Sequence, residues 1–149
     1  NMRSTGDIDA FYQESSDLIE CIEKVGKENG ISESEERWLK NSVSNLNRKP
    51  PASVCQEILS YSNLTVTIPS LVYMLGMKLE SARSRDIEDA GAIIRFERFE
   101  DVLDTAQTLE DLGFQTDFSL LMDTFEIAYG LEWLTEYLEE HIDEINKLY

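Results

Sequence analysis

Polar and apolar residues alternate near the start of the chain. From Thr5 to Tyr12 the alternation has a period of two, which predicts a strand. This period places Asp7 and Asp9 on one face of the strand and Ile8 on the other. Two carboxylates on one strand face can converge on a single divalent cation. That face is therefore the first candidate site.

The apolar positions that follow recur at helical spacing. They predict a helix over residues 17–28, with Ser15 or Ser16 as its N-cap and Gly30 as its end. An amphipathic helix of this kind is expected to cover one face of a sheet. A second, shorter helix is predicted in the segment from Trp38 to Leu46.

A β-hairpin is predicted in the middle of the chain. Its strands are expected over Glu57–Tyr61 and Leu64–Ile68, where β-branched, aromatic and aliphatic residues gather. The two residues between them, Ser62 and Asn63, form a linker whose length favours a hairpin.

Beyond Pro69 the pattern is almost entirely helical, and Ser70 can cap the first helix. Helices are predicted over residues 71–82, 86–95, 99–112, 117–129 and 131–149. In the last helix one buried stripe is expected, formed by Leu131, Leu134, Leu138, Ile142 and Ile145.

Together these elements predict one α+β domain over residues 1–149. Residues 1–69 are expected to hold a small mixed β-sheet with flanking helices, and residues 70–149 a helical part packed against it. A chain of 149 residues, 42% of them hydrophobic, is long enough for one domain with a sizeable core.

The charge of the chain is strongly negative and unevenly distributed. The net charge is −17, and residues 97–149 carry 15 acidic residues against 2 basic ones. A protein that binds nucleic acid through its phosphates needs a concentrated basic surface, to which Arg83, Arg85 and Arg95 are the nearest approach. The acidic helical surface is either a solvated face or a surface for a basic partner protein.

Two further features bear on location. No stretch approaches the roughly 20 consecutive apolar residues of a membrane span, and no signal peptide opens the sequence. The chain is therefore expected to be cytoplasmic and to have no membrane partner. Cys21 and Cys55 both fall in partly apolar stretches and are expected to be reduced thiols in the core.

Lys78 stands on the apolar face of its predicted helix, because Met74 and Leu75 precede it by four and three residues. An unpaired ammonium buried there would cost several kcal/mol, so it needs an anion or an exit to solvent. In one continuous helix, Asp86 and Asp89 would fall on nearly the same side as Lys78. The two interpretations are a structural ion pair with Asp86, and a lysine that Asp86 orients toward the phosphates of a nucleotide.

Two segments carry a resemblance to a known family. Residues 3–9 read R-S-T-G-D-I-D, and residues 75–89 read L-G-M-K-L-E-S-A-R-S-R-D-I-E-D. They resemble the R-x-T-x-D-I-D strand and the L-x-M-K-L-x-x-x-R-x-R-D-x-x-D helix pair of nucleotidyltransferase-fold proteins from bacterial toxin-antitoxin and abortive-infection loci, including AbiEii-type toxins. Residues 38–41 resemble the W-L-N signature of this family, and residues 64–70 resemble the strand before its lysine helix. The resemblance covers about residues 3–95.

The resemblance implies a metal-dependent nucleotidyltransferase. Such an enzyme transfers a nucleotide from a nucleoside triphosphate to a hydroxyl on RNA or protein, by in-line attack at the α-phosphate. The metal ligands carried over by position are Asp7 and Asp9, which would hold Mg²⁺ together with the nucleoside triphosphate.

The same resemblance assigns the remaining site residues. Lys78 and Asp86 take the catalytic positions, with Lys78 in contact with the triphosphate and Asp86 as a supporting or base-like carboxylate. The strand motif adds Arg3 and Thr5 as residues that contact the nucleotide. A toxin-like protein of this kind is expected to have a cognate antitoxin or another protein partner.

The sequence also departs from the family pattern. A glycine-rich G-G or G-S turn normally stands one strand and one helix before the aspartate pair, whereas this sequence begins at Asn1. A third metal-binding carboxylate has only Glu57 as a loose candidate. The chain is thus expected to be either a shortened version of a longer protein or a degenerate relative. The alternative function is a catalytically incomplete protein-interaction module that works through the acidic helical half.

Overall fold

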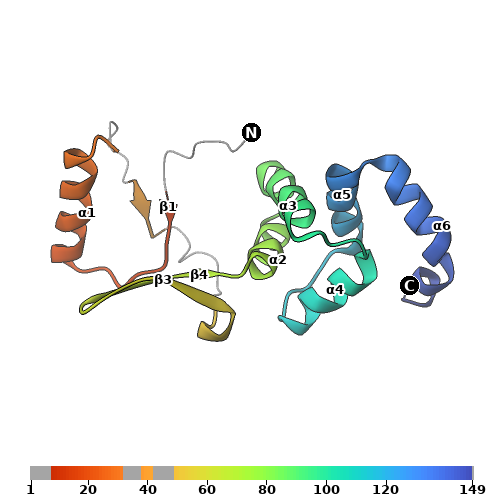
Figure 1. Cartoon of the computed structure of the whole chain (residues 1–149), viewed down its shortest axis with the longest axis horizontal. Coiled ribbons are helices and arrows are strands. Elements are labelled where there is room, and N and C mark those ends of the chain that lie inside the picture. Colours follow the sequence, from red (N-terminus) through yellow and green to blue (C-terminus); the bar gives the residue numbers. More distant parts are fainter. Residues whose placement is uncertain (1–7, 32–37, 42–48, 149) are drawn as a thin grey trace. The chain divides into compact units, whose positions relative to one another are not determined.

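The computed structural model describes residues 8–31, 38–41 and 49–148 (Figure 1). The described residues form α-helices and two small two-stranded sheets, so the predicted α+β class with a helical C-terminal half is confirmed. Two compact units divide the chain, residues 1–49 and residues 50–149.

In the first unit a short parallel sheet lies beside helix α1. Strand β1 (Ile8–Asp9) pairs in parallel with β2 (Leu39–Lys40). Helix α1 (Ser16–Glu28) begins at the N-cap Ser15, whose hydroxyl accepts a hydrogen bond from the Leu18 N–H at 3.2 Å, as the sequence predicted.

Side chains on either side of β2 form hydrogen bonds to other parts of this unit. The indole N–H of Trp38 donates to the Ile22 carbonyl of α1 at 2.8 Å, which joins the sheet to the helix. The side-chain amide of Asn41 donates to the Tyr12 carbonyl at 3.1 Å, just beyond β1. The Trp38 end of the W-L-K-N segment is thus joined to α1, and the Asn41 end to the residues that follow β1.

Three predictions for the first unit need correction. The helix expected from Trp38 to Leu46 is wrong at Leu39–Lys40, which form a strand, and residues 42–48 lie outside the described part of the chain. Backbone hydrogen bonds to the distant β1 outweigh local helical periodicity there. The first strand is shorter than the predicted Thr5–Tyr12, because residues 10–12 are not in β1. Cys21 is exposed, whereas a core thiol was predicted.

The second unit opens with the predicted hairpin. Strands β3 (Cys55–Tyr61) and β4 (Leu64–Pro69) pair antiparallel, with Tyr61 opposite Leu64 and an irregularity between Glu57 and Leu59. The short 3₁₀ turn η2 (Ala52–Val54) precedes them. The Val54 carbonyl accepts a hydrogen bond from the Ser70 N–H at 2.7 Å, and the Val54 side chain packs against the helical core. These contacts connect the base of the hairpin to the helices.

Five helices build the rest of this unit: α2 (Leu71–Ser81), α3 (Ser84–Glu97), α4 (Val102–Asp111), α5 (Phe118–Tyr129) and α6 (Leu131–Leu148). Their bounds lie close to those predicted. Leu75, Ile94, Leu109, Leu121 and Phe125 are completely buried and form the centre of a core to which α2, α3, α4 and α5 all contribute.

Aromatic rings connect α5 with α6. Phe125 stacks on Trp133 with ring centroids 5.5 Å apart, and Trp133 stacks on Tyr137 at 5.4 Å. His141 stacks on Tyr137 in turn at 4.1 Å. The spacing of four residues along α6 puts these rings on one helix face, which turns toward the core.

The single buried stripe predicted for α6 is partly wrong. Leu134 is buried, but Leu131 and Ile142 are 63% and 50% exposed. The aromatic residue Trp133 contacts α5, whereas Leu131 and Ile142 do not lie in the buried face. Large planar rings bury more apolar surface between two helices than aliphatic side chains do.

A hydrogen-bond network ties α4 to α6. The Tyr137 hydroxyl donates to the Asp101 carboxylate at 2.8 Å and accepts from the Leu103 N–H at 3.2 Å. Burial and the adjacent Asp101 carboxylate raise the pKa of Tyr137 to about 12. Burial acts to raise the pKa of Asp101, but hydrogen bonds from the Asp104 N–H and the Tyr137 hydroxyl outweigh it and leave that pKa below its ordinary value.

Arg95 caps the end of α5. Its guanidinium donates to the Ala128 carbonyl through Nε at 2.9 Å. A cation at a helix C-terminus satisfies carbonyls that lack a partner in the helix and opposes the negative end of its dipole. Arg95 therefore has a structural role in this fold.

Substitution of Gly76 by alanine tests the closest packing in the core. A methyl group on Gly76 would overlap the ring of Phe114, which is 3% exposed and cannot move aside. We expect Gly76→Ala to lower the free energy of unfolding by about 1–3 kcal/mol in urea denaturation. Gly91→Ala is the comparison, because its methyl would overlap a single atom, Cγ2 of Ile127 at 2.7 Å, whereas at Gly76 three atoms of the Phe114 ring lie within 2.6 Å. We expect a smaller loss at Gly91. Equal losses in both variants would contradict this explanation.

The hydroxyl of Tyr137 gives the second unit a distinctive response to alkali. We expect Tyr137→Phe to lower the free energy of unfolding by about 1–3 kcal/mol at neutral pH, because two hydrogen bonds are lost. The raised pKa means that the folded state favours the neutral phenol, so this stabilisation is complete below pH 10 and is lost as the pH rises from 10 to about 12. The difference from wild type should therefore shrink over that range.

Urea unfolding at several pH values measures this difference. Tyr61→Phe serves as the control, because Tyr61 is 64% exposed and the substitution should have no effect at any pH. A difference between wild type and Tyr137→Phe that stays constant up to pH 12 would refute the role of the phenol proton.

Candidate functional site

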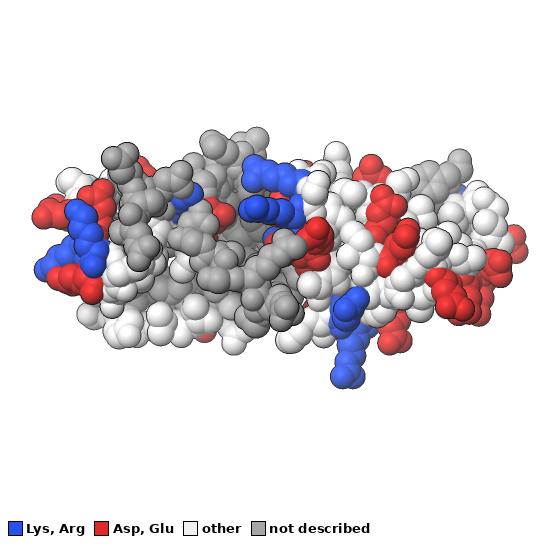
Figure 2. Space-filling view, turned by 90° about the horizontal axis from the view of Figure 1, so that it is seen from above, with Lys and Arg blue, Asp and Glu red and all other residues white. Residues whose placement is uncertain are grey.

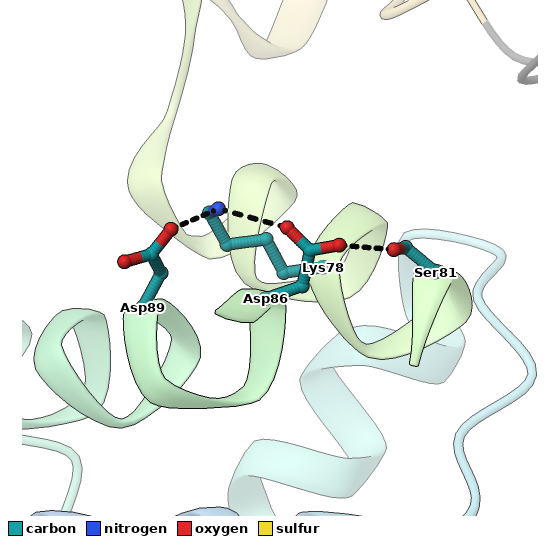
Figure 3. Close-up of polar contacts among 4 residues, drawn as sticks. All are labelled: Lys78, Ser81, Asp86 and Asp89. Carbon is teal, nitrogen blue, oxygen red and sulfur yellow. Dashed lines mark hydrogen bonds and ion pairs between the residues drawn. The ribbon is translucent and has the colours of Figure 1, made fainter. Parts of the chain in front are cut away.

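The predicted lysine and its two carboxylates meet where α2 is followed by α3 (Figure 3). The Lys78 ammonium lies 2.8 Å from Oδ2 of Asp89 and 3.4 Å from Oδ1 of Asp86. The Ser81 hydroxyl donates a hydrogen bond to the other oxygen of Asp86. We call Lys78, Ser81, Asp86 and Asp89 the lysine cluster.

A sharp turn between the helices creates this cluster. Helix α2 ends with Ala82 in the left-handed conformation, at φ 51°, and α3 begins two residues later at Ser84. The helix is therefore not continuous, and Lys78 reaches its partners across two packed helices. The prediction that Asp86 and Asp89 lie close to Lys78 is confirmed. They reach Lys78 because the chain turns at Ala82, and not because one continuous helix carries all three residues.

Core packing fixes the direction of Lys78. Leu75 and Leu79 are 0% and 6% exposed, which turns their face of α2 into the core. The side chain of Lys78, between them in sequence, is 22% exposed, so its stem is covered and its ammonium remains within reach of solvent. The cation is thus held at the edge of the core.

Distance and burial have opposite effects on the two ion pairs of Lys78. The contact to Asp89 is shorter, but the side chain of Asp89 is 56% exposed and solvent screens the pair. The side chain of Asp86 is 23% exposed and is held in place by Ser81. Because solvent screens the exposed pair more strongly, we expect the Lys78–Asp86 pair to contribute more to stability than the shorter pair with Asp89.

The predicted metal and nucleotide residues of the first unit are described only in part. Asp9 lies in β1 and is exposed, while Asp7, Arg3 and Thr5 lie outside the described residues. Within residues 8–31, 38–41 and 49–148, no three His, Cys, Asp or Glu side chains are grouped so that they could hold a metal ion.

Ser81 is the member of the cluster that the sequence did not single out. It stands in the last turn of α2, five residues before Asp86, and only the turn at Ala82 brings the two together. A serine directly before a predicted helix end was the available signal, because such hydroxyls often bond to neighbouring polar groups.

Comparison of the chain with protein-family models, curated proteins and solved structures finds no match. Among the described residues, no helix is long and apolar enough to cross a membrane.

Stability measurements separate the two ion pairs of Lys78. We expect Lys78→Met and Asp86→Asn each to lower the free energy of unfolding by about 1 kcal/mol in urea, because each breaks a partly buried pair. Asp89→Asn should lower the free energy of unfolding clearly less, since the Asp89 side chain is 56% exposed. A double-mutant cycle of Lys78→Met with Asp86→Asn isolates their coupling. A larger loss in Asp89→Asn than in Asp86→Asn would reverse this order.

Proposed function

We propose that the chain is a nucleotidyltransferase-like protein that binds Mg²⁺ together with a nucleoside triphosphate. The observation that supports this proposal most directly is the lysine cluster. Lys78, Asp86 and Asp89 are three of the charged residues of the segment that resembles the family's helix pair, and both carboxylates contact the Lys78 ammonium. A lysine oriented by a fixed carboxylate is suited to contact phosphate oxygens.

The ammonium of Lys78 has the capacity for such a contact. An ammonium carries three N–H donors, and among the described residues it meets two carboxylates, those of Asp86 and Asp89. The third donor can bond to an oxygen of the triphosphate, while Asp86, held by Ser81, acts as a positioning residue. The partial exposure of Lys78 gives a polar ligand access to it.

The donor chemistry at the start of the chain suits Mg²⁺. This hard cation prefers carboxylate oxygens, and Asp9 supplies one from an exposed strand position. The sequence motif adds Asp7 as the second ligand and Arg3 and Thr5 as contacts to the nucleotide. When bound, Mg²⁺ would neutralise phosphate charge and assist the departure of pyrophosphate.

The reaction that these assignments support is nucleotide transfer. A hydroxyl oxygen of an RNA or protein acceptor forms a bond to the α-phosphorus and releases its proton to solvent, while the bond between that phosphorus and the bridging oxygen breaks to release pyrophosphate. We propose the cytoplasm as the place of this reaction. A cognate antitoxin that controls a toxin-like activity is the proposed protein partner.

Protein binding through the acidic helical half is the second candidate function. The observation that favours it is the concentration of acidic residues over the last helices, where Figure 2 shows many red side chains and few blue ones. Residues 97–149 hold 15 acidic residues against 2 basic ones. A surface of one sign attracts partners of the opposite sign.

Thermal unfolding with nucleotide tests the first proposal. We expect the ribonucleoside triphosphate that the chain binds, together with Mg²⁺, to raise the melting temperature. At a nucleotide concentration a hundredfold above Kd, the folded state gains about 2.7 kcal/mol of stability. Lys78→Met, and separately Asp7→Asn combined with Asp9→Asn, should weaken binding at least tenfold in calorimetric titration.

Matched variants exclude general effects of charge. Lys24→Met removes a lysine whose side chain is 71% exposed, and Asp17→Asn removes an acid from the first turn of α1. Neither should change nucleotide affinity. If no ribonucleoside triphosphate shifts the melting temperature of the wild-type chain, the nucleotide-binding proposal fails.

A further inference from the structure

Helix α6 carries a second apolar stripe that faces away from the core. Leu134 and Tyr137 are each 6% exposed and lie on the inner face. Leu131 and Ile142 are 63% and 50% exposed, with the half-buried Leu138 between them. We call Leu131, Thr135, Leu138 and Ile142 the outer stripe.

The outer stripe has the geometry of a helix-binding face. Its members are spaced by four, three and four residues, so they form one row along α6. At a rise of about 1.5 Å per residue the row is roughly 16 Å long, or three turns. Its middle forms a shallow depression of about 350 Å³, lined by Thr135, Leu138, Glu139 and Ile142.

Acidic residues border this stripe along one edge. On a helical projection Glu132, Glu136, Glu139 and Asp143 occupy the sector next to the stripe, and all are exposed. The basic residue of the helix, Lys147, stands in its last turn, beyond the end of the stripe. An apolar row beside an acidic row is thus the pattern that this face presents to a partner.

We propose that the outer stripe binds an amphipathic helix of another protein, with aliphatic residues on one face and Lys or Arg along its edge. The aliphatic residues would cover Leu131, Leu138 and Ile142, and the basic edge would meet the acidic row of α6. A second copy of this chain fits poorly, because its own α6 would bring like charges together. This inference rests on the second candidate function, protein binding, and is independent of nucleotide transfer.

A synthetic peptide provides the probe. It is built from Leu and Lys, has the 18-residue length of α6, and places Leu at helical spacing on one face. A second peptide has the same composition, with its order permuted so that the Leu residues do not share a face. Fluorescence anisotropy at moderate ionic strength should give at least tenfold tighter binding of the chain to the amphipathic peptide. Equal affinity for both peptides overturns the proposal.

Paired variants test the apolar part of the face. Leu131→Ser combined with Ile142→Ser should weaken binding of the amphipathic peptide at least tenfold. Phe96→Ser is the control, because Phe96 is 75% exposed on α3, outside the stripe. Unchanged binding in the double variant overturns the stripe as the site. Circular dichroism confirms that both proteins keep their helices.

Charge reversal tests the acidic edge separately. Glu139→Lys combined with Asp143→Lys should weaken binding at least tenfold, whereas Asp123→Lys on α5 should change it much less. If the stripe variants lose binding and the charge variants do not, the proposed basic edge of the partner is wrong. If neither pair of variants changes binding of the peptide, protein binding through α6 fails as well.

Sedimentation of the chain alone tests a second copy as the occupant. We expect a monomer. A dimer that the Leu131→Ser, Ile142→Ser variant abolishes would identify a second copy as the occupant instead.

Discussion

The burial of Leu75 and Leu79 is the constraint on which the second unit depends. These residues fix the rotation of α2 against the core that α3, α4 and α5 complete. Once that rotation is set, Lys78 can only emerge on the side of α3, where Asp86 and Asp89 lie. The glycine at position 76 permits the close approach of Phe114 to the same helix. Hydrophobic packing therefore determines the electrostatic arrangement, because the ion pairs alone are too exposed to orient a helix.

Helices of the second unit were predictable because their signals are local. Ser70 and Asp117 cap helices in the structure. Gly113 and Gly130, at φ 86° and 96°, lie directly after the helix ends predicted at residues 112 and 129. The hairpin was predictable for the same reason, since two linker residues determine its register. Each of these features is encoded within a few neighbouring residues.

Long-range contacts were not predictable from the same patterns. The strand at Leu39–Lys40 exists because of hydrogen bonds to β1, about thirty residues earlier, and its residues alone favour a helix. Likewise, the choice between the two stripes of α6 depends on Phe125 of α5, which stacks on Trp133. In the candidate site, Lys78 and Asp86 could be named from the sequence, but the role of Ser81 depends on the turn at Ala82.

The two tryptophans of the chain are divided between its two compact units. Trp38 donates a hydrogen bond to α1 in residues 1–49, and Trp133 is stacked between Phe125 and Tyr137 in residues 50–149. With no other tryptophan in the sequence, each unit has its own intrinsic fluorophore in a distinct environment. Replacement of either indole by phenylalanine leaves an emission signal that reports the folding of one unit alone, so the cooperativity between the units is directly observable in fluorescence.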